Sequence, residues 1–240
     1  MPGYRIGVWN TTEIIQMMSH YLQSENHRLQ DAHAYVGLDS HAEIELHPLL
    51  AQAFAPSSFG IHREVGYPSS PMSRPNDAQR QRCDLVLTPI EGQALFDPIH
   101  EQRVQDKAVG TLFESFVADH LPDEGDALPE DAYWIEVKSV GQFSYVDGVP
   151  GANPKYTADL LGGPRSDVIK LASEPLIRFG GSLVVLFSED QETGPHDIAA
   201  SAQAMIEHDL PIAVPVFESF PITNHAGNEW CTLGLIPIRM

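Results

Sequence analysis

The segment SLVVLF at residues 182–187 constrains the fold more than any other feature of this sequence. It lacks polar alternation after Ser182, so a strand formed here presents apolar side chains on both faces. Such a strand must lie inside a sheet that other elements cover on both sides. It is also far shorter than the roughly 20 apolar residues of a membrane span, so we expect no membrane partner.

Hydrophobic periodicity predicts further elements along the rest of the chain. Helices are expected at residues 11–24, 41–55 (capped by Ser40), 103–121 and 198–209. Strands are expected at residues 60–67, 82–87, 132–140, 182–187, 214–220 and 231–238. Residues 141–164 are predicted to form a long Gly/Pro loop, followed by a short helix that Ser166 caps and Pro175 interrupts.

This order of helices and strands predicts an α/β fold, a mixed central sheet flanked by helices. We find no linker that would divide the chain, so residues 1–240 are expected to form a single domain. In that domain, residues 89–131 would be an insertion and the last two strands an addition to the core. The two cysteines, Cys83 and Cys231, are expected to be reduced thiols. The first residues show no basic start followed by an apolar run, so we expect a cytoplasmic protein.

The charge of the chain is strongly negative but unevenly distributed. A net charge of −19 argues by itself against a nucleic-acid partner, because phosphate binding needs Lys and Arg. However, residues 89–131 hold eleven acidic and only two basic side chains, whereas residues 60–83 hold four arginines against two acids. The acidic excess therefore lies largely outside the segments that carry the candidate chemistry.

Charged residues interrupt two of the predicted apolar strands. In IEVK, Glu136 and Lys138 are two apart and share one face, while their apolar neighbours share the other. Asp84 interrupts the strand 82–87 in the same manner. Buried charges of this kind are costly unless they are paired or bind a metal. If the two strands are neighbours, both carboxylates meet beside Lys138, which is the equipment for hydrolysing a phosphodiester with a Mg²⁺-activated water.

The order of these residues resembles the PD-(D/E)xK, or restriction-endonuclease-like, nuclease superfamily. The matching pieces cover about residues 41–90 and 132–188: a helix carrying Glu, a strand, the Asp84 strand, the strand with Glu136-x-Lys138, a helix and SLVVLF. The resemblance implies an αβββαβ core and Mg²⁺-dependent (or Mn²⁺-dependent) cleavage of nucleic acid. It also implies metal ligation by Asp84, Glu136 and the Val137 carbonyl. Lys138 would orient or deprotonate the attacking water or stabilise the developing charge.

The helix carboxylate of that family must be either Glu43 or Glu45. With the apolar positions of residues 46–54 defining the inner face, Glu43 lies nearer that face and is matched to the family's helix Glu. The sequence departs from the pattern at Cys83, which replaces the motif's proline. It departs again in the separation of Asp84 and Glu136 by 52 positions, which the insertion explains.

Simpler interpretations of the same residues remain open. Glu136 and Lys138 are also typical of a surface pair on an amphipathic strand, and Asp84 of a strand-end turn. Glu64 is either a supporting acid of the site or part of a solvated face. Lys170 either contacts phosphate or pairs with Glu174 four residues later.

The eleven histidines do not form a zinc motif. No pair has HExxH or HxH spacing, and the two cysteines form no CxxC. His41 and His47 lie six apart on one predicted helix, which is a poor spacing for one metal. We interpret the histidines as scattered surface or core residues.

The sequence therefore predicts a metal-dependent nuclease, with DNA favoured over RNA as substrate. The basic residues expected to guide the nucleic-acid backbone are Arg74, Arg80, Arg82 and Lys170. The aromatics expected to stack on bases are Phe143, Tyr145 and Tyr156. The alternative is a catalytically silent module of the same fold that binds a protein partner through its acidic surface, an interpretation that the net charge favours.

Overall fold

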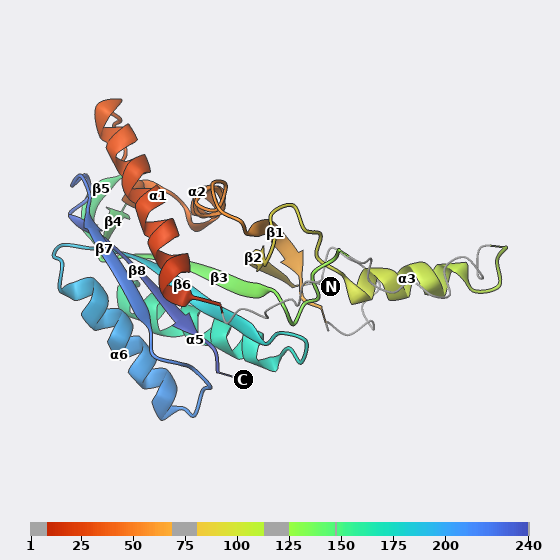
Figure 1. The fold of residues 1–240 in the computed structure, drawn as a ribbon. Coiled ribbons are helices and arrows are strands. Elements are labelled where there is room, and N and C mark those ends of the chain that lie inside the picture. The colour runs from red at the N-terminus through yellow and green to blue at the C-terminus, as the bar shows by residue number, and fades with distance from the viewer. Residues whose placement is uncertain (1–8, 69–80, 113–124, 147, 240) are drawn as a thin grey trace.

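A six-stranded sheet forms the centre of the molecule (Figure 1). The computed structural model describes residues 9–68, 81–112, 125–146 and 148–239. The strand order is β1-β2-β3-β6-β8-β7, and a separate two-stranded sheet joins β4 and β5. Four of the five neighbouring pairs in the large sheet are antiparallel, and β3 with β6 is the parallel pair. The expected mixed α/β fold with a central sheet is thereby confirmed.

The elements follow one another along the chain with these bounds. The helices are α1 (Thr11–Asp31), the short 3-10 helix η1 (Leu38–Ser40), α2 (Glu43–Gln52), α3 (Pro98–Ala108), α5 (Tyr156–Ser173) and α6 (Thr193–Glu207). The strands are β1 (Gly60–Gly66), β2 (Arg82–Thr88), β3 (Tyr133–Gly141), β4 (Phe143–Val146), β5 (Val149–Ala152), β6 (Phe179–Ser188), β7 (Val216–Pro221) and β8 (Trp230–Pro237).

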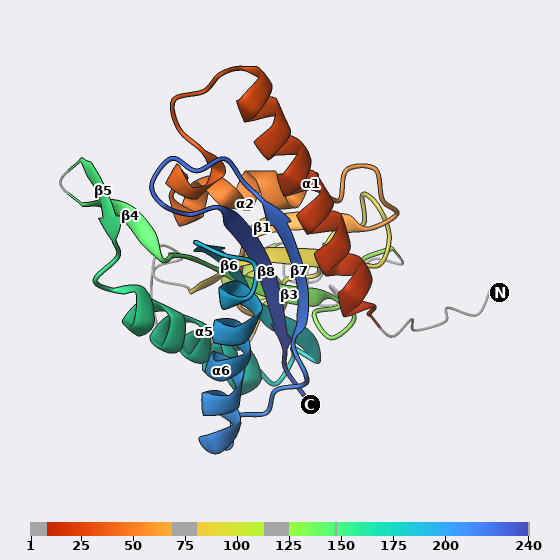
Figure 2. The same cartoon turned by 90° about the vertical axis from the view of Figure 1, so that its left-hand side faces the viewer.

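The helices cover both faces of the sheet, as the apolar strand 182–187 requires. Figure 2 shows α1 and α2 on one side of the sheet and α5 and α6 on the other. Alternate residues of β6 enter the two cores: Leu183 and Val185 pack with α1 and α2, whereas Val184 and Leu186 pack with α5 and α6. All four side chains are fully buried. The middle strand is thus held by hydrophobic packing from both sides.

The largest difference from the sequence prediction lies in α5. Residues 156–164 were expected in a loop, and Ser166 was expected to cap a helix, but one helix runs through both segments. Pro164 sits inside it and cannot donate a hydrogen bond to the Leu160 carbonyl. Instead, the Ser201 hydroxyl of α6 donates to that carbonyl over 3.0 Å. Because this contact satisfies Leu160, and because Leu160, Val168 and Leu171 are buried against the sheet, the helix tolerates its proline.

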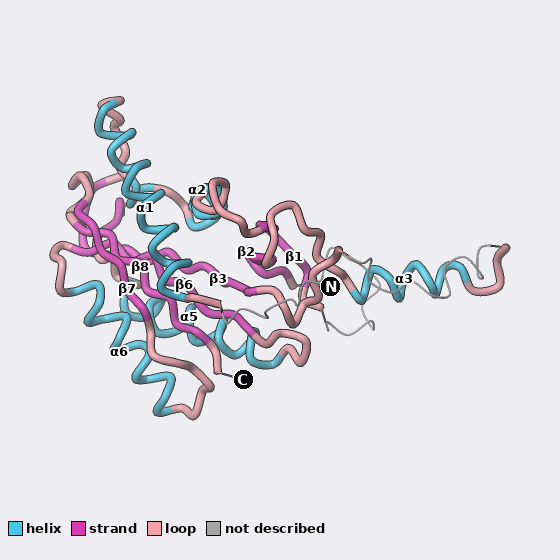
Figure 3. The backbone as a smooth tube through the Cα atoms, in the orientation of Figure 1, coloured by secondary structure: helices cyan, strands magenta, loops and turns pink. Residues whose placement is uncertain are grey.

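Other boundaries differ by smaller amounts. α2 begins at Glu43 rather than after Ser40, and the Glu45 side chain accepts the Ala42 N–H at its start. α3 begins at Pro98, with Asp97 as its N-cap, and the part of the predicted helix 103–121 beyond residue 112 lies outside the described residues. The tube in Figure 3 shows α3 extending away from the sheet beyond β1 and β2. β4 and β5 form a hairpin where a loop was predicted.

Both cysteines are buried and free, in agreement with the sequence prediction. Within the described ranges, the structure contains no helix with the length and hydropathy of a bilayer crossing.

Candidate metal centre

The candidate site forms where β2 and β3 separate. The two strands pair from Leu85–Leu87 to Tyr133–Ile135. One step further, the Val137 N–H donates to the Asp84 carboxylate over 2.7 Å, and the Cys83 thiol donates to the Ile135 carbonyl over 3.2 Å. Side chains therefore take the places that backbone groups occupy in a regular ladder. We call the place where β2 and β3 stop pairing the opening. There the Asp84 carboxylate and the Cys83 thiol, rather than backbone groups of β2, contact β3.

A break in the alternation of β1 and β2 gives the opening its shape. In β1, Glu64 has a φ of 54°, a left-handed conformation that is unusual for a residue other than glycine. In β2, Leu85 and Leu87 pack on the α1 and α2 side, while both Cys83 and Val86 pack on the α5 side. Strict alternation would place Cys83 with Leu85. The two strands thus change faces at Glu64 and Asp84, which brings these carboxylates to the opening.

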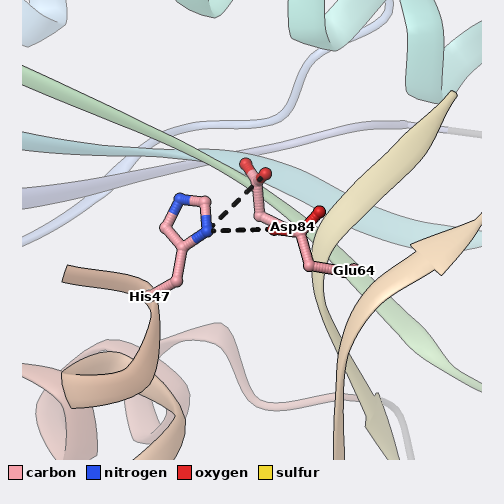
Figure 4. A group of neighbouring side chains, drawn as sticks. All are labelled: His47, Glu64 and Asp84. Atoms are coloured by element: carbon pink, nitrogen blue, oxygen red, sulfur yellow. Dashed lines mark ion pairs between the residues drawn. The ribbon is translucent and has the colours of Figure 1, made fainter. Parts of the chain in front are cut away.

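His47 of α2 joins these two carboxylates. Its Nδ1 lies 3.5 Å from Glu64 Oε1 and 3.9 Å from Asp84 Oδ1. Figure 4 marks both ion pairs with dashed lines. One ligand atom from each residue lies within 4.8 Å of the other two. The His47 side chain is only 3% exposed, yet neither ring nitrogen has a hydrogen-bond partner in the part of the chain that the structure describes. A buried polar group without a partner is costly, so the arrangement favours a bound ligand at the imidazole.

The chemistry of these three residues fits a divalent cation. Carboxylate oxygens suit Mg²⁺ and Mn²⁺, and imidazole is a frequent ligand of transition metals. One nitrogen and two carboxylates therefore favour a transition ion such as Mn²⁺ over Mg²⁺, which prefers oxygen and keeps its water. The structure gathers a candidate ligand set that differs from the predicted set of Asp84, Glu136 and the Val137 carbonyl, with Asp84 common to both.

Glu136 lies beside this cluster in a buried hydrogen-bonded network. The Tyr67 hydroxyl donates to Glu136 Oε1, and Lys170 Nζ lies 3.7 Å from the same oxygen. Burial raises the pKa of the Glu136 carboxyl to about 8. The negative charges of Asp84 and Asp167 act in the same direction, while the hydrogen bond from Tyr67 opposes them. Asp84 and Glu136 are therefore close enough to repel each other, which a cation between them would relieve.

Lys138 connects helices on the two faces of the sheet. Its Nζ lies 3.0 Å from Glu43 Oε1 of α2 and 3.7 Å from Asp167 Oδ2 of α5. The second oxygen of Glu43 accepts the Ser139 N–H over 3.1 Å. Burial acts to lower the pKa of the Lys138 ammonium, but Asp167 and Glu43 more than compensate and leave that pKa raised. Lys138 is therefore positively charged at neutral pH.

The remaining predicted residues divide into three groups. Lys170 lies within the network, 2.9 Å from Asp167, and the structure shows no ion pair between Lys170 and Glu174 among the described residues. Arg82 is exposed at the start of β2, whereas Arg74 and Arg80 lie outside the described residues. Of the aromatics, Tyr145 is 45% exposed, while the Tyr156 hydroxyl donates to Asp197.

Sequence reasoning missed His47. The histidines were judged by their spacing from one another, and His47 has no histidine at a suitable distance. The available signal was its position one helical turn after Glu43, which places both side chains on the same face of α2. Tyr67 and Asp167 were missed as well, because the site residues that they contact, Glu136 and Lys138, lie in distant segments of the chain.

Comparison of the chain with protein-family models, curated proteins and solved structures gave no match.

Proposed function

We propose that this protein is a divalent-metal-dependent nuclease that hydrolyses phosphodiester bonds of DNA or RNA. The observation that carries the proposal is the meeting of His47, Glu64 and Asp84 beside Glu136 and Lys138, with a buried imidazole whose nitrogens make no hydrogen bond to any described residue. A cation at these ligands would polarise the phosphate and supply a water of lowered pKa. DNA and RNA are polymers of phosphodiester bonds, which are the bonds that such a site would hydrolyse.

The connectivity supports a restriction-endonuclease-like core. With α3 and the β4–β5 hairpin set aside, the order α2, β1, β2, β3, α5, β6 follows the αβββαβ sequence of elements. β1, β2 and β3 form an antiparallel meander, and α5 crosses to β6, which is parallel to β3. Asp84 lies on the second strand of this unit and Glu136 and Lys138 on the third, as in the family that the sequence resembles.

The protein's own groups have separable roles in this proposal. Lys138 carries a positive charge between Glu43 and Asp167, so it would stabilise negative charge at the phosphate rather than take a proton from water. Asp84 accepts the Val137 N–H. The carbonyl of a strand residue points to the same side as its N–H, so the Val137 carbonyl faces Asp84 and extends the ligand set.

Metal titration and cleavage assays test the proposal with matched variants. Mn²⁺ should raise the melting temperature of the wild type by mass action. His47→Ala and Asp84→Asn should abolish that rise and the cleavage of single- and double-stranded DNA and RNA. The controls are His20→Ala, at an exposed position of α1, and Asp106→Asn, which changes the same group at an exposed position of α3. Equal shifts in all variants would contradict the site.

The net charge of −19 favours a second candidate, a silent module that binds a basic protein partner. That candidate predicts cation binding without cleavage of any nucleic acid, and salt-sensitive capture of a basic partner. Mn²⁺-dependent cleavage that Lys138→Met abolishes, while cation binding remains, would exclude it.

A further inference from the structure

A pocket of about 340 Å³ opens beside β1, next to the candidate metal centre. Its volume lies at the small end of the range of about 300–1,000 Å³ typical for small-ligand sites. One wall is the sheet, through Val65 and Trp134, and the other is the chain that leads into α3, through Leu95 and Phe96. Figure 1 shows that this chain passes close to β1 before α3 begins. The pocket is therefore built between the sheet and the start of the insertion.

Glu64 belongs to both the pocket and the metal cluster. It lines the pocket with its neighbours His62 and Arg63, and its carboxylate faces His47 across 3.5 Å. A substrate phosphate at the cluster would therefore have its attached nucleoside within reach of the pocket. Glu64, whose φ is left-handed, is thus the residue that the two sites share.

The lining matches the chemistry of a nucleobase. Leu95 and Phe96 supply apolar and aromatic surface for a flat ring, and the buried Trp134 forms the floor beneath it. Arg63 is exposed at the rim and supplies a positive charge for a backbone phosphate. The His62 ring is fixed by a contact of 2.9 Å to the Gln93 carbonyl, so the polar edge of the pocket is held in place.

We propose that this pocket binds one unpaired base adjacent to the phosphate at the metal centre, so that the substrate is single-stranded nucleic acid. The inference rests on the proposed nuclease function. A base inside a duplex is stacked and paired, and bringing it into such a pocket requires unstacking that costs a few kcal/mol. Single strands avoid that cost, so they should bind and be cleaved in preference to duplexes.

Fluorescence of 2-aminopurine tests the pocket separately from the chemistry. A short single-stranded oligodeoxynucleotide carrying this base at one position is titrated with the full-length protein in Ca²⁺. Stacking in the pocket should quench the fluorescence of 2-aminopurine only when that base occupies one particular position in the strand. Phe96→Ala should weaken binding roughly five- to 150-fold, and Phe96→Leu, which keeps the bulk of the side chain, should still lose the quenching. Arg63→Gln should weaken binding without removing the quenching.

The controls are Tyr35→Ala and Arg165→Gln, which change exposed side chains elsewhere. Position-specific quenching that depends on Phe96, together with unchanged Mn²⁺ binding by the variants, supports the proposal. Mn²⁺-dependent cleavage with equal rates on single strands and duplexes and no quenching overturns the pocket while leaving the nuclease intact. Phe96-dependent quenching without Mn²⁺ binding or cleavage supports the pocket and overturns the nuclease.

Discussion

Gly163 of α5 allows the side chain of Lys138 to lie against the helix. A Cβ added at residue 163 would lie 2.9 Å from Lys138 Cδ and 3.3 Å from Cγ. The preceding residue, Gly162, offers a matched control, because a Cβ there would meet nothing within 4 Å. Gly163→Ala should therefore displace Lys138 from Glu43 and Asp167, and Gly162→Ala should not.

The expected effects on the free energy of unfolding follow from the local geometry. Alanine is preferred over glycine inside a helix by about 1 kcal/mol, so Gly162→Ala should stabilise the protein by up to that amount. At residue 163 the same gain is opposed by a Lys138 side chain forced off its rotamer, at about 0.5–1.5 kcal/mol. Residue 163 also precedes Pro164, a position that disfavours the helical conformation for residues with a Cβ.

A double-mutant cycle in urea denaturation separates the two opposing effects. Lys138→Ala removes the side chain that the new Cβ meets but leaves the pre-proline cost unchanged. Gly163→Ala should therefore be more favourable in the Lys138→Ala background than in the wild type by about 0.5–1.5 kcal/mol. Gly162→Ala should be additive with Lys138→Ala within about 0.5 kcal/mol. Additivity at residue 163 would refute the packing of Lys138 on this glycine.

Two further predictions concern buried polar groups near the site. Since the pKa of Glu136 is raised to about 8 from an ordinary value of 4.5, the folded protein binds more protons than the unfolded chain between these values. The free energy of unfolding should therefore fall as the pH rises from about 5 to about 8. In chelator-treated buffer, Glu136→Gln should flatten this dependence. Parallel pH profiles of the wild type and the variant in denaturation assays would contradict the burial argument. Ser201→Ala removes the donor to the Leu160 carbonyl beside Pro164, so it should lower the free energy of unfolding by about 1–3 kcal/mol, whereas Ser173→Ala, at the exposed end of α5, should change it little.

Much of the fold could be predicted because the pattern of apolar residues reflects burial directly. The uninterrupted segment 182–187 required helices on both faces, and the structure has them. α5 could not be predicted in the same way. Gly162, Gly163 and Pro164 are typical of a loop, and the hydrogen bond that compensates for Pro164 comes from Ser201, which lies in another element. Local preferences were overridden here by packing.

The site could be predicted in part for a related reason. Glu43 was chosen over Glu45 from the helix face alone, and Glu43 is the carboxylate that reaches Lys138 while Glu45 caps the helix. His47 is on the same face, but its chemistry depends on Glu64 and Asp84, which come to it from other strands.

The break in alternation at Glu64 and Asp84 explains why periodicity could not locate the whole site. A period of two assigns each strand residue to one face, and it groups Asp84 with Val86, whose side chain packs on the α5 side in the structure. In the structure, the strands change faces at this point, so Asp84 reaches His47 of α2 and also lies beside Glu136. A left-handed residue such as Glu64 costs about 1–2 kcal/mol, and strain of this kind collects at functional sites. The strain at Glu64 is thus an independent reason to place the function of this protein at the opening between β2 and β3.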